Sequence, residues 1–258
     1  MIEIKTDEEI ELLRKSNLLV SATLATIAPL MKPGISTEEI DRIAEEHIRD
    51  FGGVPGFKGY NGFPKTLCIS INDQVVHGIP SARTLREGDI VSVDCGVYMN
   101  GFHGDSAFTF AIGEIAPENR HLIQVTREAL FLGIAQAVAG NRIGDIGHAV
   151  QAHAEANRFS VVREMVGHGV GRHLHEEPEV PNYGRPGTGP LLREGMTIAI
   201  EPMINLGRRQ IYQDRDGWTI RTADHKPSAH FEHSVAIRAS KADILSDFEV
   251  IDKVLNNN

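Results

Sequence analysis

Two aspartates, Asp94 and Asp105, lie on either side of Asn100-Gly101, a dipeptide that is the strongest short signal for a β-hairpin. With this dipeptide as the loop, Asp94 faces Ala107 across the hairpin and Asp105 faces Gly96. Side chains alternate along strands, so both carboxylates share one face as diagonal neighbours, about 7 Å or less apart at Cβ. Two such carboxylates repel each other and tend to hold protons. A multivalent cation between them removes the conflict, so the hairpin predicts a metal site.

Glycines and apolar residues distinguish the two faces of this hairpin. We expect Gly96 and Gly104 to leave space beside the carboxylates, because a glycine inside a strand often marks a close approach. The opposite face is apolar and includes Val93, Phe108 and Phe110. The hairpin is therefore expected to have one acidic face and one core face.

Two glutamates and a histidine have similar surroundings later in the chain. Glu201 and Glu232 each lie in a predicted strand, 196–201 and 228–237, whose alternate residues are apolar. An acid in such a strand points into an enclosed polar space, where a metal can compensate its charge. His168 lies in the glycine-rich stretch 167–171, whose backbone can approach a site closely. The candidate metal ligands are Asp94, Asp105, His168, Glu201 and Glu232.

The charges of these ligands favour two ions over one. Four carboxylates carry a charge of about -4, which two divalent ions balance and a single ion does not. Oxygen-rich ligation with one imidazole suits Mn, Fe, Co or Zn. A pair of such ions activates water for hydrolysis, so the residues predict a dinuclear metallohydrolase.

Four helices are expected to frame the strands. A capping box formed by Thr6 and Glu9 starts a helix that runs to about Met31, and a second box at 36–39 starts one that ends near 52–53. Residues 116–118 open a third helix that ends near 139. Asp145 caps a fourth, which ends near Asn157.

The two helix pairs suggest an internal repeat. The second pair follows the first at an offset of about 109 residues, and each pair precedes a strand-rich stretch, at 65–112 and 160–238. We therefore expect a single catalytic domain over 1–258, built from two similar halves at about 1–112 and 113–258.

Composition and charge exclude several classes of protein. The chain is 41% hydrophobic and 24% charged, which is ordinary for a globular domain. The net charge of -9 and pI near 5.7 argue against binding to nucleic acid or anionic membranes, which require basic surfaces. No export signal or membrane span is apparent, so we expect a cytoplasmic protein with no membrane partner. Cys68 and Cys95 are expected to be buried free thiols.

The candidate ligands, in this order and context, resemble the metal set of the methionine aminopeptidases. The matching motifs are Gly-Phe-His-Gly-Asp at 101–105, Gly-His-Gly-Val-Gly-Arg at 167–172, His-Glu-Glu-Pro at 175–178 and Ile-Glu-Pro-Met at 200–203. The resemblance covers nearly the whole chain. Cys68, the lack of a long insertion after His168 and the lack of an N-terminal extension are typical of the bacterial type, type I. The implied fold is the pita-bread fold, an α/β (α+β) arrangement of pseudo-two-fold halves with a curved antiparallel sheet flanked by helices.

The resemblance also implies how the ligands are divided. Asp94 binds one ion, His168 and Glu201 bind the other, and Asp105 and Glu232 bridge the two. The implied activity is removal of the N-terminal methionine from nascent proteins and peptides with a small second residue. In this reaction, hydroxide activated by the two ions attacks the first peptide bond.

Three residues are implied to act on the reacting atoms. Glu201 is the general base and acid, and His175 hydrogen-bonds the scissile carbonyl and the developing oxyanion. His77, in the stretch 75–80, helps to position the peptide nitrogen. The partners are N-terminal methionyl peptides and nascent chains, whether free or at the ribosome, and the enzyme is expected to be a monomer.

The methionine side chain is expected to enter an apolar, adaptable pocket. Correspondence with the family assigns this pocket to Phe57, Tyr60, Phe63, Cys68, Leu174 and Trp218, together with His77 and His175. Three of these residues depart from the family pattern. Leu174 stands where an aromatic residue is common, Phe57 where a cysteine often lies, and Phe63 where a tyrosine is frequent. These substitutions change the shape of the pocket but keep it apolar. The preference for methionine should therefore survive.

Other functions remain possible on the same scaffold. Aminopeptidase P and prolidase usually carry a large additional N-terminal domain, whereas about 65 residues precede the first predicted strand here. A creatinase-like member would lack the ligands, and all five are present. A non-catalytic module that binds RNA or histones is opposed by the acidic pI and the complete ligand set. Release of methionine from the peptide Met-Ala-Ser distinguishes an enzyme from such a module.

Overall fold

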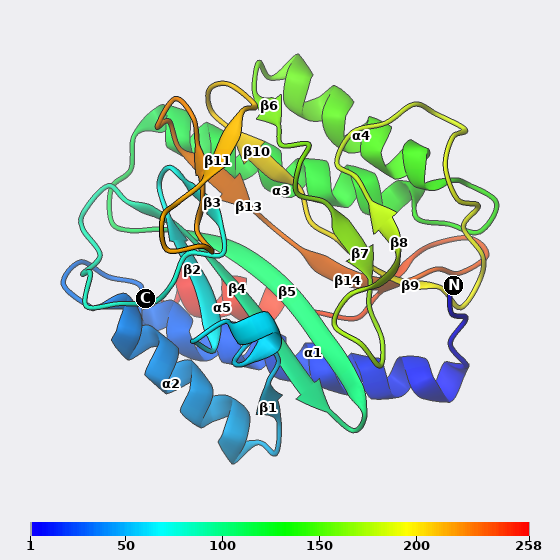
Figure 1. The fold of residues 1–258 in the computed structure, drawn as a ribbon, viewed down its shortest axis with the longest axis horizontal. Coiled ribbons are helices and arrows are strands. Elements are labelled where there is room, and N and C mark those ends of the chain that lie inside the picture. Colours follow the sequence, from blue (N-terminus) through cyan, green and yellow to red (C-terminus); the bar gives the residue numbers. More distant parts are fainter. Residues whose placement is uncertain (1, 258) are drawn as a thin grey trace.

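Two pairs of helices enclose the strands from opposite sides. The structure is a computed structural model in which residues 2–257 are described. Helices α1 and α2 lie along one side, and α3 and α4 lie along the other, with the strands between them (Figure 1). The helices are α1 (Asp7–Ile27), α2 (Thr37–Asp50), α3 (Pro117–Gln136), α4 (Ile143–Ala156) and α5 (Glu249–Asn256), with 3-10 turns η1 (Ala28–Leu30) and η2 (Tyr60–Gly62).

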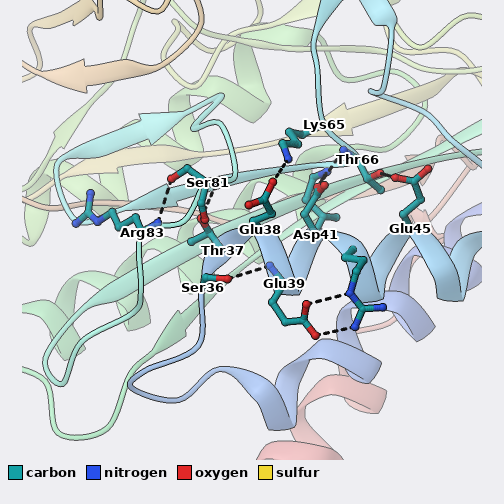
Figure 2. Close-up of polar contacts among 12 residues, drawn as sticks. Ser36, Thr37, Glu38, Glu39, Asp41, Glu45, Lys65, Thr66, Ser81 and Arg83 are labelled. Atoms are coloured by element: carbon teal, nitrogen blue, oxygen red, sulfur yellow. Dashed lines mark hydrogen bonds and ion pairs between the residues drawn. The ribbon is translucent and has the colours of Figure 1, made fainter.

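The helix starts in the first half lie where the capping patterns predict them. Thr6 and Glu9 form the complete capping box at the start of α1. Ser36 caps α2 by accepting the Glu39 amide proton, but the Glu39 carboxylate pairs with Arg42 and does not return to Ser36 (Figure 2). The first α-helix is shorter than predicted, because the chain continues after Ile27 as the 3-10 turn η1.

The predicted cap of the fourth helix is wrong. Helix α4 begins three residues earlier than the Asp145 cap requires, with Arg142 as the residue that precedes it. Asp145 lies in the first turn, where its Oδ2 accepts the Arg142 amide proton at 2.7 Å and its Oδ1 accepts that of Gly187 at 2.7 Å. The aspartate thus stabilises the helix start from inside the helix and also attaches a distant loop.

The strands pair in antiparallel fashion and form four hydrogen-bonded sheets within residues 2–257. The first contains β1 (Val54–Pro55), β2 (Leu67–Ile71), β4 (Ile90–Met99) and β5 (Phe102–Ala111). The second contains β6 (Ser160–Val161), β10 (Met203–Asn205) and β13 (Ser228–His230). The third contains β3 (Gln74–Val76), β11 (Ile211–Gln213) and β12 (Ile220–Thr222). The fourth contains β7 (Gly167–Gly169), β8 (Glu176–Val180), β9 (Thr197–Ile200), β14 (His233–Ala236) and β15 (Asp243–Ile244).

The register of the predicted hairpin is confirmed. Strands β4 and β5 pair with Asp94 opposite Ala107 and Gly96 opposite Asp105. The loop residues Asn100 and Gly101 have φ values of 55° and 85°, as a type I′ turn requires. Both aspartates therefore lie on one face of the sheet.

Strand β5 is joined to the chain between β13 and β14 by hydrogen bonds outside the regular ladders. The Glu232 amide donates to the carbonyl of Ala107 at 2.9 Å, and Ser106 Oγ donates to the carbonyl of Glu232 at 2.6 Å. Ser234 Oγ donates to the carbonyl of Asp105 at 2.8 Å. These bonds bring the backbone of Glu232 next to that of Asp105, although the two residues are far apart in sequence.

The roles expected for the two hairpin glycines need correction. A Cβ on Gly104 would lie 2.5 Å from the backbone of Ser16 and Asn17, so this glycine allows the close approach of α1. A Cβ on Gly96 would lie 2.4 Å from the ring of Phe57. Gly96 therefore makes room for an aromatic side chain, and neither glycine leaves empty space beside the aspartates.

The apolar core between the helices and the sheets consists of several clusters of buried residues. Its largest cluster of buried residues joins α1 and α2 to β2, β4 and β5, and extends to β9 and β14. Cys68 and Cys95 are both buried free thiols, as expected. Among the described residues, no helix is long and apolar enough to cross a bilayer.

Candidate metal centre

One cavity collects the residues that the sequence singles out. It has a volume of about 200 Å³. Its lining contains all five candidate ligands, both candidate catalytic histidines and all six apolar pocket residues: Asp94, Asp105, His168, Glu201, Glu232, His77, His175, Phe57, Tyr60, Phe63, Cys68, Leu174 and Trp218. Asn61 completes the lining. The geometry thus brings these side chains together, while their individual roles stay predictions.

The five candidate ligands come from elements that are far apart in sequence. Asp94 and Asp105 lie on β4 and β5, and His168 lies in the middle of β7. Glu201 directly follows β9, and Glu232 lies between β13 and β14. Their convergence depends on two contacts described above, the β4–β5 hairpin and the hydrogen bonds between β5 and Glu232.

The imidazole of His168 is oriented by the backbone carbonyl of the next residue. Its Nδ1 lies 2.8 Å from the carbonyl oxygen of Gly169, an acceptor, so Nδ1 carries the ring proton. The lone pair of Nε2 therefore faces the cavity, 3.7 Å from Oδ2 of Asp105 and 3.5 Å from Oε1 of Glu201. Hydrogen bonding of one ring nitrogen to fix the other as a ligand is a common feature of metal-binding histidines.

Several buried oxygens in the cavity lack hydrogen-bond partners. Among the described residues these include Oδ1 of Asp94, Oδ1 of Asp105 and Oε1 of Glu232. Buried polar atoms normally find a partner, and an unpaired carboxylate oxygen is especially costly. Three unpaired acid oxygens in one cavity therefore indicate a positively charged ligand.

Burial raises the pKa values of all four acids, and neighbouring carboxylates raise three of them further. Burial raises the pKa of Asp94 to about 7. Burial, followed by the charges of Asp94 and Glu201, raises the pKa of Asp105 well above its usual range. Burial and neighbouring carboxylates likewise raise the pKa values of Glu201 and Glu232. In the absence of a cation, the charged forms of these acids are therefore disfavoured.

The donor set fits divalent metal ions. Asp105, His168 and Glu232 offer one ligand atom each, and these atoms all lie within 4.8 Å of one another. Burial, and then the charge of His175, lowers the pKa of His168 to about 3, so its imidazole is neutral and available as a ligand. Oxygen ligands with one neutral imidazole are typical of transition-metal sites.

Apolar side chains form one wall of the cavity. Phe57, Phe63, Cys68 and Leu174 form a separate buried cluster, against which Tyr60 and Trp218 pack. The rings of Phe63 and Trp218 meet edge to face, with centroids 5.1 Å apart. An unbranched apolar side chain can bury its surface against this wall.

Two further histidines flank the acids. His175 is an exposed residue whose ring meets that of His168 edge to face at 4.3 Å, and its Nδ1 lies 2.8 Å from Oη of Tyr60. His77 directly follows β3 and has a φ of 59°, a left-handed conformation that is uncommon for residues other than glycine. Burial lowers the pKa of His77 to about 4, so its ring is neutral at physiological pH.

Sequence reasoning missed one residue of this site, His230. Its side chain is buried, and its Nε2 has no hydrogen-bond partner and lies 3.7 Å from Oε2 of Glu201. The alternation that identified Glu232 places His230 on the same face, two residues earlier. That pattern could have included His230 in the candidate site.

A second cavity meets the first at the acids. It has a volume of about 490 Å³ and shares His77, Asp94, His168, His175 and Glu201 with the first. Its lining also includes Glu164, Glu177 and Glu179, beside apolar residues such as Met165 and Val166, and we call this cavity the acidic groove. Asp94, His168 and Glu201 therefore lie where the apolar pocket meets the acidic groove.

Comparisons with known proteins identify relatives along nearly the whole chain. The profile of metallopeptidase family M24 matches residues 11–239. A methionine aminopeptidase of Clostridium perfringens is 52% identical over 246 residues, which cover 95% of this chain and 99% of the relative. The crystal structure of a methionine aminopeptidase from Thermotoga maritima superposes with a TM-score of 0.94 at 43% identity, covering 96% of this chain and all of that one.

A more distant similarity concerns the fold alone. A prolidase from Pyrococcus furiosus has a TM-score of 0.73 at 24% identity, and the match covers 95% of this chain but 65% of that one. At this level of identity the shared architecture carries no information about substrate.

Proposed function

The chain belongs to metallopeptidase family M24, and on that premise we propose that it is a methionine aminopeptidase of the bacterial type. It removes the N-terminal methionine from proteins and peptides, and its fold is the pita-bread fold of these enzymes. The single observation that carries this proposal is the junction of an apolar pocket with a buried group of four acids and one histidine.

We infer that two divalent ions occupy the acid cluster. Asp94 would hold one ion, His168 and Glu201 the other, and Asp105 and Glu232 would bridge them. The close approach of His168 to Asp105 and Glu201 and the unpaired oxygens of Asp94, Asp105 and Glu232 support this division. When bound, such ions supply Lewis acidity to a peptide carbonyl and lower the pKa of water. Co, Mn, Fe and Zn all suit these ligands.

We assign proton transfer to Glu201. Its Oε1 faces His168 and its Oε2 faces His230, so both oxygens lie at the centre of the site. Burial raises the pKa of the Glu201 carboxyl group in the metal-free site, and a bound divalent cation would lower it again, so that the carboxylate could accept a proton and pass it on. The Asn182 side chain fixes the Glu201 backbone by donating from Nδ2 to its carbonyl oxygen at 2.9 Å.

We assign His175 to the scissile carbonyl. With Tyr60 Oη donating to Nδ1, the other ring nitrogen, Nε2, carries the proton and can donate to the carbonyl oxygen. A donor fixed in this way stabilises the charge that develops on that oxygen in the transition state. His77 lines both cavities and is suited to positioning the peptide nitrogen.

The apolar wall receives the methionine side chain in this proposal. Phe57, Phe63 and Leu174, which depart from the family pattern, all belong to its buried cluster. Their combined surface remains apolar, so methionine is retained as the preferred first residue. The ring of Phe57 lies over Gly96, and its position sets the width of the pocket on that side.

The acidic groove is the proposed path for the rest of the substrate. A peptide whose first side chain fills the apolar pocket and whose first peptide bond lies at the acids must continue into this groove. Nascent chains, free or at the ribosome, are the proposed substrates. A cytoplasmic location and a monomeric state stay predictions.

Methionine release tests this function directly. Purified protein, treated with EDTA and reloaded with Mn²⁺ or Co²⁺, should release methionine from Met-Ala-Ser much faster than leucine from Leu-Ala-Ser. Activity should disappear on chelation and return with metal. Binding of two ions without release of methionine would instead favour a non-catalytic binding module, and release of Xaa from Xaa-Pro peptides would favour a prolidase-like enzyme.

A further inference from the structure

Helix α2 presents a row of carboxylates to the segment that forms the apolar pocket. The row consists of Glu38, Asp41 and Glu45, spaced so that they lie on one face of the helix. Figure 2 shows these side chains directed toward Lys65 and Thr66, at the end of the pocket segment 56–67.

Asp41 makes the most enclosed contact of this row. Its side chain is buried, and its Oδ1 accepts the amide protons of Thr66 at 3.0 Å and Leu67 at 2.8 Å. Thr66 and Leu67 are themselves fully buried. Because both residues are buried, loss of the Asp41 carboxylate would take away the acceptor that these two amides have in the structure.

Glu45 holds both ends of the same segment. Its Oε2 accepts a hydrogen bond from Thr66 Oγ1 at 3.1 Å and an ion pair from Lys58 Nζ at 2.6 Å. Lys58 is near the start of the segment and Thr66 is near its end. Glu38 adds an exposed ion pair with Lys65 at 2.8 Å.

The segment has little regular structure of its own. Gly59, Asn61 and Gly62 have φ values of 90°, 49° and 87°, and short-range backbone bonds fold the chain into the turn η2. Such a turn depends on its attachments for a fixed position. Its side chains include Phe57, Tyr60 and Phe63, and β2 follows immediately with Cys68.

We propose that Asp41 and Glu45 are positioning residues that set the shape of the methionine pocket by holding the segment 56–67 against α2. The inference rests on the proposed function, because it assigns this pocket to the methionine side chain. Neither residue lines the cavity, so both act through the pocket segment. Loss of either attachment lets the aromatic wall move, which weakens substrate binding more than it slows the chemical step.

The first test compares Asp41→Ala with Asp41→Asn. The alanine variant removes the acceptor of two buried amides, whereas asparagine retains an oxygen that can accept both. For Met-Ala-Ser we expect Asp41→Ala to raise KM about tenfold with kcat within about twofold of wild type. Asp41→Asn should restore most of the loss. Metal content should be unchanged in both variants.

A milder variant and a matched control accompany this pair. Thr66→Val removes the hydroxyl that contacts Glu45 and keeps the size of the side chain. If Asp41→Ala does not fold, this variant tests the positioning role in its place. We expect it to raise KM about threefold. Glu46→Ala, on the same helix but exposed and paired with Arg42, should leave KM and kcat unchanged.

Hydrogen exchange tests the positioning role of Asp41 and Glu45 independently of whether the protein is a methionine aminopeptidase. Amides of residues 57–63 should exchange faster in Asp41→Ala and Thr66→Val than in wild type or Glu46→Ala, whether or not the protein releases methionine. Folded, metal-loaded Asp41→Ala or Thr66→Val with wild-type KM and wild-type exchange would overturn the positioning role. A wild-type protein that releases no methionine would overturn the proposed function instead, and exchange alone would then decide the positioning role.

Discussion

Nε2 of His168 lies 3.5 Å from Oε1 of Glu201, with its lone pair directed into the cavity that the two side chains share. This separation is long for a hydrogen bond but is about that of two ligands bonded to one ion at roughly 2.0–2.2 Å. Oδ2 of Asp105 lies at a similar distance, 3.7 Å, from the same nitrogen. Both distances are compatible with Nε2 and these carboxylate oxygens contacting one cation.

Metal binding should release protons and strengthen as the pH rises. The pKa of Asp94 is raised to about 7, above an ordinary aspartate value of about 3.9. The stability that this group contributes to the metal-free fold is therefore present at low pH and lost as the pH rises through about 7. A divalent cation must displace that proton below about pH 7. His168, with a pKa lowered to about 3, adds no competing proton.

Calorimetry in buffers of different ionisation enthalpy measures this effect. We expect net proton release on binding Mn²⁺ at pH 6.5, and a larger rise in Tm on adding metal at pH 8 than at pH 5.5. Metal affinity that is independent of pH across this range would contradict the predicted ligand set.

His175→Ala should slow the chemical step without removing metal. If His175 donates to the carbonyl oxygen, its loss lowers kcat by about 100-fold or more, as for other donors to a developing oxyanion. Two ions per protein should still bind, because His175 is outside the predicted ligand set. Tyr60→Phe serves as a control that keeps the imidazole but removes its partner at Nδ1, and it should have a smaller effect. An unchanged kcat would remove His175 from the chemistry.

Alanine at the two hairpin glycines should have different consequences. Gly104→Ala places a Cβ 2.5 Å from the backbone of α1 and should lower the free energy of unfolding by about 1–3 kcal/mol. In Gly96→Ala the three atoms nearest to the new Cβ all belong to the side chain of Phe57, and we expect this ring to be displaced. This variant should raise KM for methionyl peptides with a smaller loss of stability. Urea unfolding and steady-state kinetics distinguish the two, and equal effects of both variants would contradict these roles.

The ion pair of Lys5 with Glu176 should stabilise the turn that carries His175. Its side chains are 2% and 9% exposed, and Nζ lies 2.7 Å from Oε2, while the other oxygen accepts the His173 amide proton at 3.1 Å. Glu176→Gln should lower the free energy of unfolding by about 1–3 kcal/mol. Glu3→Gln, which removes the exposed partner of the same lysine, should cost less than about 0.5 kcal/mol. If thermal unfolding gave the same loss of unfolding free energy for Glu176→Gln and Glu3→Gln, the stabilising role of the buried pair would be contradicted.

The parts of this fold that depend on local chemistry could be predicted from the sequence. The register of β4 with β5 follows from the Asn100-Gly101 turn and the alternation of the strands, and the start of α1 follows from Thr6 and Glu9. The candidate ligands were recognisable because acids inside otherwise apolar strands need a compensating charge.

The parts that depend on contacts between distant segments could not be predicted. Gly104 is required by the approach of α1, and nothing in the hairpin sequence indicates which helix lies there. Asp41 reads as an ordinary polar residue on an amphipathic helix, yet it is buried against Thr66 and Leu67. The cap predicted at Asp145 was wrong because Asp145 is the third residue of α4, and helix starts are hard to place to within a few residues.

Anomalous diffraction from crystals grown with Mn²⁺ tests the central assignment most directly, when combined with methionine release by the same preparation. The account predicts two Mn²⁺ peaks, with Asp105 and Glu232 contacting both, Asp94 contacting one, and His168 and Glu201 contacting the other. An active, Mn²⁺-saturated enzyme that holds a single ion, or that leaves any of these four carboxylates without a metal contact, would contradict it.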